Sequence, residues 1–234
     1  LDISIIDELP PGRKPVKTYA VDETMRPRIN NFVRKMVKEG RQVYIVCPLI
    51  EESDAVEAKS AQETAEKVAA QFSDLSVGLI HGKMRPAEKE KVMKGFVEGK
   101  IDILVSTTVI EVGVNVPNAT IMVIENAERF GLAQLHQLRG RVGRGEHQSY
   151  CILFNQSSSE LSRQRMEIMT KTNDGFVISE KDLELRGPGD VFGVRQHGLP
   201  EMRIANLYRD IDILKEVQSA VKYIMNNNLL GDER

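Results

Sequence analysis

Short apolar runs alternate with amphipathic helical segments through the first two thirds of this 234-residue sequence. The runs are rich in Val and Ile, have the length of strands, and lie at 43–47, 77–80, 101–105, 120–124 and 150–154. Helical segments of about 10–15 residues separate several of these runs. This alternation predicts an α/β fold in which a parallel sheet is covered by helices on both faces.

Segments outside this alternation set the predicted domain boundaries. Residues 7–17 contain three prolines and a glycine, which a helix interior does not accommodate, so residues 1–20 are predicted to be an interdomain linker. Residues 21–156 are predicted to form the sheet domain. Residues 157–234 are predicted to be mainly helical, with a helical hairpin and loop and a final amphipathic helix.

The pattern of helical segments, glycines and prolines in the C-terminal part differs from that in the sheet part. We expect a helix at 160–171, a segment interrupted by Gly and Pro at 174–200, and a last helix at about 204–225. The chain begins without Met or a basic region, which suggests a piece of a longer polypeptide and no signal peptide.

Composition restricts the class of protein. Hydrophobic residues make up 41% of the chain and charged residues 28%, so collagen-like, low-complexity and wholly disordered chains are excluded. No apolar run approaches the ~18 residues of a membrane span. With a net charge of −2, any anion-binding surface must be local. Cys47 and Cys151 lack CxxC spacing and are predicted to be buried thiols, so no metal site is expected.

The densest chemical signal lies at 137–144, which reads Gln-Leu-Arg-Gly-Arg-Val-Gly-Arg. Three arginines fall within six residues without an acid, and Gly140 and Gly143 permit close approach to another chain or a phosphate. Arginine suits phosphate because its guanidinium is always charged, planar and rich in donors. The segment predicts a site that completes a nucleotide pocket from outside, as arginine fingers do. The alternative is a solvated basic turn.

A second segment, 106–117, follows directly after a predicted strand. In open α/β sheets, ligands lie beyond the carboxyl ends of the strands. The small hydroxyls here can bind phosphate oxygens of a nucleic acid, Gly113 allows close approach, and Asn115 can bond a ribose hydroxyl. An ordinary turn with Thr caps is the alternative. His81 and Lys83 also follow a predicted strand and either touch DNA phosphate or lie in a solvated loop.

Together these two segments resemble motifs V and VI of superfamily 2 helicases. The surrounding sequence is similar to the RecG family of bacterial ATP-dependent DNA helicases, and the part after residue 160 resembles the translocation motif shared with the transcription-repair coupling factor. The segments that carry the resemblance are 81–84, 125–137, 163–166, 172–176, 182–190 and 193–196.

The resemblance implies that residues 21–156 are the second of two RecA-like motor domains and assigns roles to individual residues. Those implied at ATP are Gln137, Arg141 and Arg144 as catalytic residues, with Gly113, Asn115, Gly140 and Gly143 as binding residues. Those implied in DNA binding or coupling are Thr107, Thr108, His81, Lys83, Arg165, Arg186 and Gln196. Asn115 stands where the family usually has Asp, and it retains an acceptor oxygen.

No G-x-x-x-x-G-K-[ST] sequence is present, so the P-loop Lys and the acid that holds Mg²⁺ are expected in a first motor domain upstream. Residues 5–8 superficially resemble a Walker B strand but are interpreted as linker because prolines follow. ATP and Mg²⁺ are the implied cofactors, bound mainly by that first domain. The chain alone is predicted to be inactive.

The resemblance further implies a helicase that hydrolyses ATP, translocates on duplex DNA and remodels stalled forks and Holliday junctions in recombination and repair. Implied partners are branched duplex DNA, the first motor domain, a wedge domain of the same polypeptide and a single-strand-binding protein. No membrane is implied, and the expected location is the bacterial cytoplasm, at the nucleoid. The alternatives are the matching region of the transcription-repair coupling factor and a non-catalytic nucleic-acid-binding module.

Overall fold

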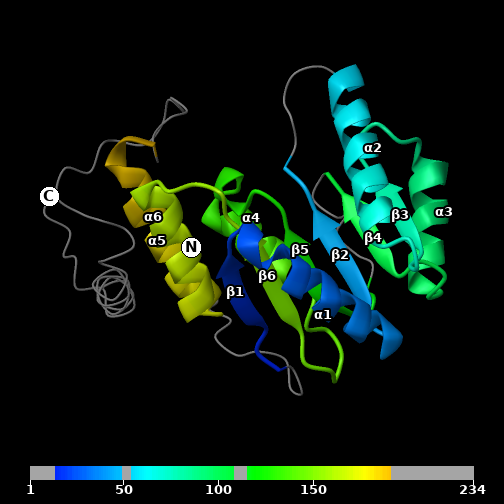
Figure 1. Ribbon diagram of the computed structural model, residues 1–234. Helices are drawn as coiled ribbons and strands as arrows, with labels where there is room; N and C mark the ends of the chain where they lie inside the picture. The colour runs from blue at the N-terminus through cyan, green and yellow to red at the C-terminus, as the bar shows by residue number, and fades with distance from the viewer. Residues whose placement is uncertain (1–13, 49–53, 108–114, 191–234) are drawn as a thin grey trace, which may run out of the picture. The chain divides into compact units, whose positions relative to one another are not determined.

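The computed structural model describes residues 14–48, 54–107 and 115–190. One sheet of six parallel strands runs through this part of the chain in the order β1-β6-β5-β2-β4-β3, as Figure 1 shows. The strands are β1 (Lys17–Val21), β2 (Gln42–Val46), β3 (Val77–Ile80), β4 (Ile103–Ser106), β5 (Ala119–Ile124) and β6 (Tyr150–Phe154). The predicted α/β class with a parallel sheet is confirmed.

Helices cover both faces of the sheet. They are α1 (Arg26–Lys38), α2 (Asp54–Gln71), α3 (Pro86–Val97), α4 (Leu132–Arg139), α5 (Glu160–Lys171) and α6 (Gly175–Asp190), with short 3₁₀ turns η1 (Glu23–Met25) and η2 (Ala127–Arg129). One apolar core holds buried side chains of α3, α4, α5 and α6, including Phe96, Leu135, Met166 and Ile178. The other core holds side chains of α1 and α2. None of the described helices combines the length and the apolarity needed to cross a membrane.

Local sequence explains where several helices begin and end. Asp22 accepts a hydrogen bond from the backbone N–H of Thr24 and starts the turn that leads into α1. Gly40, at φ +79°, follows the end of α1, where a left-handed residue is commonly glycine. Ser159 caps α5 through the N–H of Ser162. Pro86 is the first residue of α3, a position where the backbone N–H that proline lacks would have no acceptor within the helix.

Both cysteines are buried and free, as predicted. Burial raises the pKa of Cys47 and that of Cys151 to about 12 each. The thiols are therefore protonated at neutral pH and chemically inert in the folded protein.

The boundaries differ from the sequence prediction in three places. β1 begins at Lys17, within the segment 1–20 that is predicted to be linker, and it pairs with β6 from Lys17 to Val21. α6 crosses the first half of the segment 174–200, and its start is fixed by the N–H of Phe176 donating to Asp174 Oδ1 at 2.8 Å. The compact unit that holds the sheet extends to Leu185, so it includes α5 and runs into α6 instead of ending at residue 156. The expected helix at about 204–225 lies outside the described residues.

Candidate functional site

The arginine-rich segment 137–144 begins on α4 and continues into a turn beyond it. Leu132, Leu135 and Leu138 are fully or almost fully buried and fix α4 against the sheet. Gly143 adopts φ +77°, and a Cβ there would lie 2.9 Å from Val16 Cγ2. The turn therefore requires glycine at this position for both conformation and space.

Two arginines of this turn lie beside the core. Arg141 and Arg144 are half-buried, and Arg144 Nε donates to the carbonyl of Gly140 at 3.1 Å. Burial raises the pKa of Tyr44, on β2, to about 12, while the positive charges of Arg144 and Arg141 act in the opposite direction. Both guanidinium groups thus lie near the Tyr44 hydroxyl. Gln137 is exposed on α4.

The structure brings the two predicted segments into contact. A Cβ on Gly145 would lie 2.8 Å from the carbonyl oxygen of Pro117, so the backbones meet there without room for a side chain. Asn115 is exposed two residues before Pro117, and Arg144 immediately precedes Gly145. The predicted ribose contact and the predicted phosphate contact are therefore held by adjoining turns. Thr108 and Gly113 lie outside the described residues.

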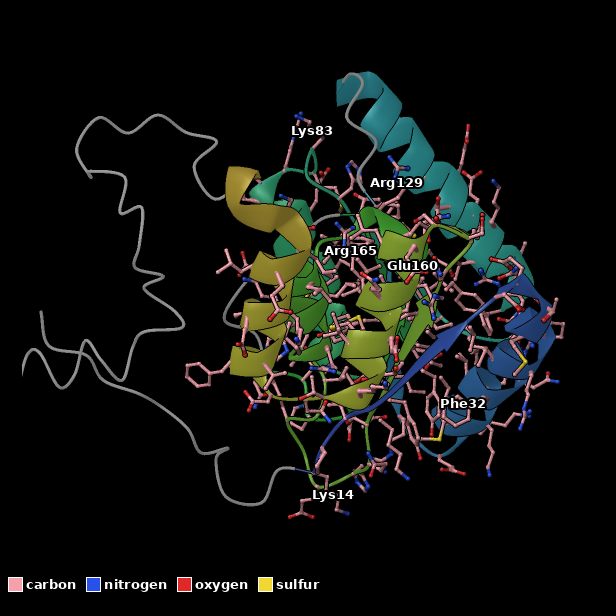
Figure 2. The ribbon with its side chains drawn as sticks, turned by 90° about the vertical axis from the view of Figure 1, so that its left-hand side faces the viewer. Lys14, Phe32, Lys83, Arg129, Glu160 and Arg165 are labelled. Atoms are coloured by element: carbon pink, nitrogen blue, oxygen red, sulfur yellow. The ribbon has the colours of Figure 1, made fainter. Side chains whose placement is uncertain are left out.

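The carboxyl ends of β3 and β4 hold the predicted DNA-facing residues together. The N–H of Thr107 donates to the carbonyl of Ile80 at 3.3 Å, which places Thr107 next to His81. Thr107 is buried and His81 is half-buried. Lys83 is exposed on the turn between β3 and α3, and Figure 2 shows it projecting outward there.

Most of the buried side-chain polar atoms that lack a hydrogen-bond partner belong to predicted site residues. Among the described residues, the buried side-chain atoms without a hydrogen-bond partner are His81 Nδ1, Thr107 Oγ1, Thr120 Oγ1, Arg141 Nε and Arg165 Nε. All but the Thr120 atom belong to residues that the sequence assigned to ATP or DNA. Unpaired buried polar atoms cost free energy, so their concentration here fits a surface that a ligand or another domain completes. Arg186 lies on α6, but its side chain, like all of Gln196, is outside the described residues.

Arg139 has a structural role that sequence reasoning missed. It is only 2% exposed, and its guanidinium donates to the carbonyls of Met169 and Thr172, both at 2.8 Å, at the end of α5. A further N–H lies 3.0 Å from His136 Nδ1. These bonds tie α4, which leads into the turn with Arg141 and Arg144, to the end of α5, where helix carbonyls attract cations. The only sequence signal is that Arg139 falls three residues after His136 on the buried side of α4.

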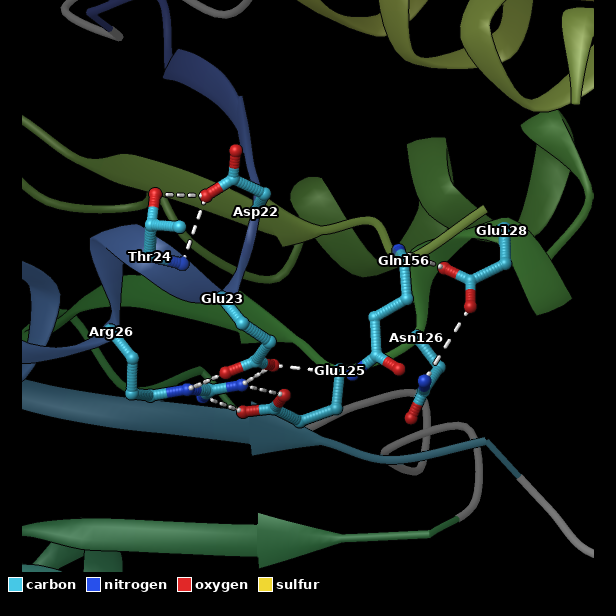
Figure 3. A network of polar contacts seen from close by, with 8 residues as sticks. All are labelled: Asp22, Glu23, Thr24, Arg26, Glu125, Asn126, Glu128 and Gln156. Atoms are coloured by element: carbon cyan, nitrogen blue, oxygen red, sulfur yellow. Dashed lines mark hydrogen bonds and ion pairs between the residues drawn. The ribbon is translucent and has the colours of Figure 1, made fainter. Parts of the chain in front are cut away.

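A polar network fastens the carboxyl edge of the sheet near this site (Figure 3). Arg26, at the start of α1, binds both carboxylate oxygens of Glu125, at 2.5 and 2.7 Å, and also pairs with Glu23. Its guanidinium lies 3.5 Å from the centre of the Phe154 ring. Although burial opposes the charge, the hydrogen bonds that Arg26 donates to Glu125 and Glu23 raise the pKa of Arg26. This network joins α1 to the segment that follows β5 and leads into α4.

Comparisons with known proteins agree with this arrangement. A model of the helicase conserved C-terminal domain matches residues 27–146, and a model of the C-terminal part of domain 3 of the ATP-dependent DNA helicase RecG matches residues 172–233. RecG of Bacillus subtilis (strain 168) is 56% identical over 92% of this chain, and RecG of Escherichia coli (strain K12) is 52% identical over 96%.

A solved structure of RecG bound to a three-way DNA junction is 49% identical, with a TM-score of 0.70, over 88% of this chain and 26% of that one. The chain spans about a third of the length of the curated relatives, 32% for the Bacillus protein and 33% for the Escherichia protein.

Proposed function

This chain belongs to the family of helicase conserved C-terminal domains, in its RecG branch, and on that premise we propose that it is the second motor domain and translocation region of an ATP-dependent DNA helicase. The intact protein hydrolyses ATP to move along duplex DNA and remodels branched structures such as stalled forks and Holliday junctions. The observation that carries the proposal is the set of unpartnered buried atoms on His81, Thr107, Arg141 and Arg165.

On the nucleotide side, this chain supplies positive charge to a site whose remaining parts lie in the first motor domain. The donor set fits a phosphate, because Arg141 has an N–H without a protein partner and no acid lies in the segment 137–144. Arg141 and Arg144 stabilise charge on the transferring phosphoryl group, a role worth about 10³–10⁵ in rate. Gln137 from α4 and Asn115 from the turn that ends at Pro117 orient polar groups of the nucleotide.

Mg²⁺ chemistry belongs to the other half of the site. In the described part of this chain, no three His, Cys, Asp or Glu side chains cluster in a way that holds a metal. Magnesium favours carboxylates together with substrate phosphates, so the acid of the first motor domain is the fitting protein ligand, while the P-loop Lys of that domain would contact the phosphates. When bound, the ion neutralises charge on the phosphates. The residues of this chain add the remaining positive charge from the opposite side.

On the DNA side, the residues at the carboxyl ends of β3 and β4 suit the phosphate backbone. Thr107 and Thr108 donate hydroxyl hydrogen bonds, and His81 and Lys83 add an imidazole and a cation. Hydroxyl and ammonium donors of this kind bind phosphate oxygens, and such contacts carry no sequence information. Recognition is therefore of backbone and branch shape.

The connection between the two functions runs through α4 and α5. Arg139 on α4 donates hydrogen bonds to the end of α5. When ATP draws the motor domains together, a movement of α4 is therefore transmitted to α5 and to α6, which follows it. Arg165 on α5, Arg186 on α6 and Gln196 beyond it then move against the duplex. The further partners in this proposal are the first motor domain, a wedge domain and a single-strand-binding protein, and the site of action is the nucleoid in the bacterial cytoplasm.

The test uses the full-length protein that contains this chain and a synthetic forked DNA. We expect Arg144→Ala to abolish DNA-stimulated ATP hydrolysis, and Arg186→Ala to retain much of it while losing fork unwinding. Arg163→Ala is the matched control, because Arg163 is exposed on α5 and pairs with its neighbour Glu160 on the same helix. Normal hydrolysis by Arg144→Ala would refute the finger assignment and favour a non-catalytic nucleic-acid-binding module.

A further inference from the structure

The exposed face of α1 carries a stripe of positive charge on the side of the sheet away from α4. Arg28, Asn31, Lys35 and Lys38 recur at the helical period and are all exposed. The stripe is about 15 Å long, because Arg28 and Lys38 are ten helical steps apart at about 1.5 Å each. Together with Arg34 and Glu39, the last three residues of the stripe line an open hollow of about 470 Å³. We call Arg28, Asn31, Lys35 and Lys38 the α1 stripe.

The charges of the α1 stripe are not neutralised by ion pairs within the described structure. No ion pair forms between Arg28, Lys35 or Lys38 and any acid among the residues that the structure describes. Asp74, which also feels the charge of Lys38, pairs instead with Arg34 at 3.2 Å. By contrast, α5 pairs Arg163 and Lys171 with Glu160 and Glu167 of its own helix. α1 has no acid at all between Arg26 and Lys38.

Helix stability alone does not account for this charge pattern. Lys35 and Lys38 lie in the last turn of α1, where cations are favourable. Arg28 lies in the first turn, where the helix dipole favours an acid and disfavours a cation. A cation there without a carboxylate partner opposes the dipole, which indicates that the positive charge serves an external anion.

The chemistry of the stripe favours nucleic acid over protein. The exposed large apolar side chains of the described residues lie on β1, α3, α5 and α6, and none is on α1. A docked protein segment would need such apolar anchors, whereas a phosphate backbone needs only cations and hydrogen-bond donors. The stripe is long enough to follow about four phosphates of one strand, at about 3.4 Å each along the duplex axis.

We propose that the α1 stripe is a second DNA-binding surface that holds the phosphate backbone of duplex DNA independently of the residues at the carboxyl edge of the sheet. α1 packs on the core opposite the one that contains α4, and Figure 1 shows it crossing that face in front of the strands. The inference rests on the proposed function, because it takes branched duplex DNA as the ligand. It adds a surface that none of the helicase motifs includes.

The test compares two charge-matched triple variants of the full-length protein. Arg28→Gln/Lys35→Gln/Lys38→Gln removes the stripe, and Lys67→Gln/Lys91→Gln/Lys94→Gln removes the same charge from exposed positions on α2 and α3. Binding of a fluorescein-labelled forked duplex is followed by fluorescence anisotropy over a range of KCl concentrations. The slope of log K against log [KCl] should fall by about 0.9 for each phosphate that the protein no longer neutralises, so by about two to three in the stripe variant. The control should keep the wild-type slope.

Further measurements distinguish a failure of this inference from misfolding of a variant and from a failure of the proposed function. ATP hydrolysis at saturating DNA should stay at the wild-type rate in both variants, which shows that they fold, and Lys35→Gln alone should lower the slope by about 0.9. A stripe variant with wild-type affinity and slope would overturn the inference and leave the stripe to an acidic protein partner. A wild-type protein that shows no DNA-stimulated hydrolysis would instead overturn the proposed function.

Discussion

Replacing Arg139 with Met is expected to release the end of α5 from α4. The guanidinium donates to two carbonyls at the end of that helix, those of Met169 and Thr172, and both lie at 2.8 Å. Each carbonyl left without a partner in a buried setting costs about 1–3 kcal/mol. Met is similar in length and carries no charge to bury, which offsets part of this cost. The expected net destabilisation at the end of α5 is about 2–4 kcal/mol.

Hydrogen exchange of the full-length protein measures this destabilisation locally. The amide of Thr172 donates to Ile168 and closes the last turn of α5, so it reports the opening of that turn. A destabilisation of about 2–4 kcal/mol corresponds to exchange that is roughly 30-fold to 700-fold faster, at about 1.4 kcal/mol per factor of ten. Arg163→Met on the exposed side of α5 is the control and should leave the exchange unchanged.

The exchange rate also decides whether Arg139 couples the two helices. If Arg139→Met leaves exchange at the end of α5 at the wild-type rate, the carbonyls are satisfied in another way and Arg139 does not couple α4 to α5. If exchange accelerates while basal ATP hydrolysis persists and fork unwinding disappears, Arg139 transmits motion without taking part in the chemistry.

Two sites around α4 give further predictions. Gly145→Ala should lower both the rate of ATP hydrolysis and the melting temperature of the full-length protein, because the new Cβ would lie 2.8 Å from the rigid carbonyl oxygen of Pro117. Gly95→Ala is the control and should change neither, because its Cβ would meet only the flexible end of a side chain, at 3.2 Å. Burial, together with the charge of Arg139, lowers the pKa of His136, so its neutral form stabilises the fold above pH ~6.5 and this contribution disappears as the pH falls below that value. His136→Gln should therefore show a smaller fall in melting temperature between pH 7.5 and pH 5.5 than the wild type.

The central strands could be predicted from sequence because burial on both faces leaves a continuous apolar run. β6 begins and ends where the run 150–154 does, and β5 extends the run 120–124 by one residue. The edge strand β3 keeps the apolar run 77–80 and could be predicted, whereas β1 was missed because it pairs only with β6 and its residues are all exposed or half-buried. A strand of this kind has no apolar run, and its partner lies more than a hundred residues away in the chain.

α6 shows a different limit of the sequence pattern. Three glycines and a proline between 175 and 189 suggested an interrupted segment, yet the helix crosses them. The overlooked signal was Asp174, whose carboxylate accepts from the N–H of Phe176 and so starts the helix. Packing of Ile178 into the core then outweighs the poor helix propensity of glycine.

The three arginines of the segment 139–144 show what only three-dimensional structure decides. In sequence they are equivalent cations spaced by glycines, and all three suit a phosphate. In the structure, Arg139 uses its donors on carbonyls of α5 and could reach a phosphate only by releasing that helix. Arg141 keeps a buried N–H without a partner beside the core. All three arginines carry the same charge, so their roles differ only in whether the N–H donors are already bonded within the protein. Arg139, whose donors are bonded, stabilises the fold, whereas Arg141 has a donor left for a ligand.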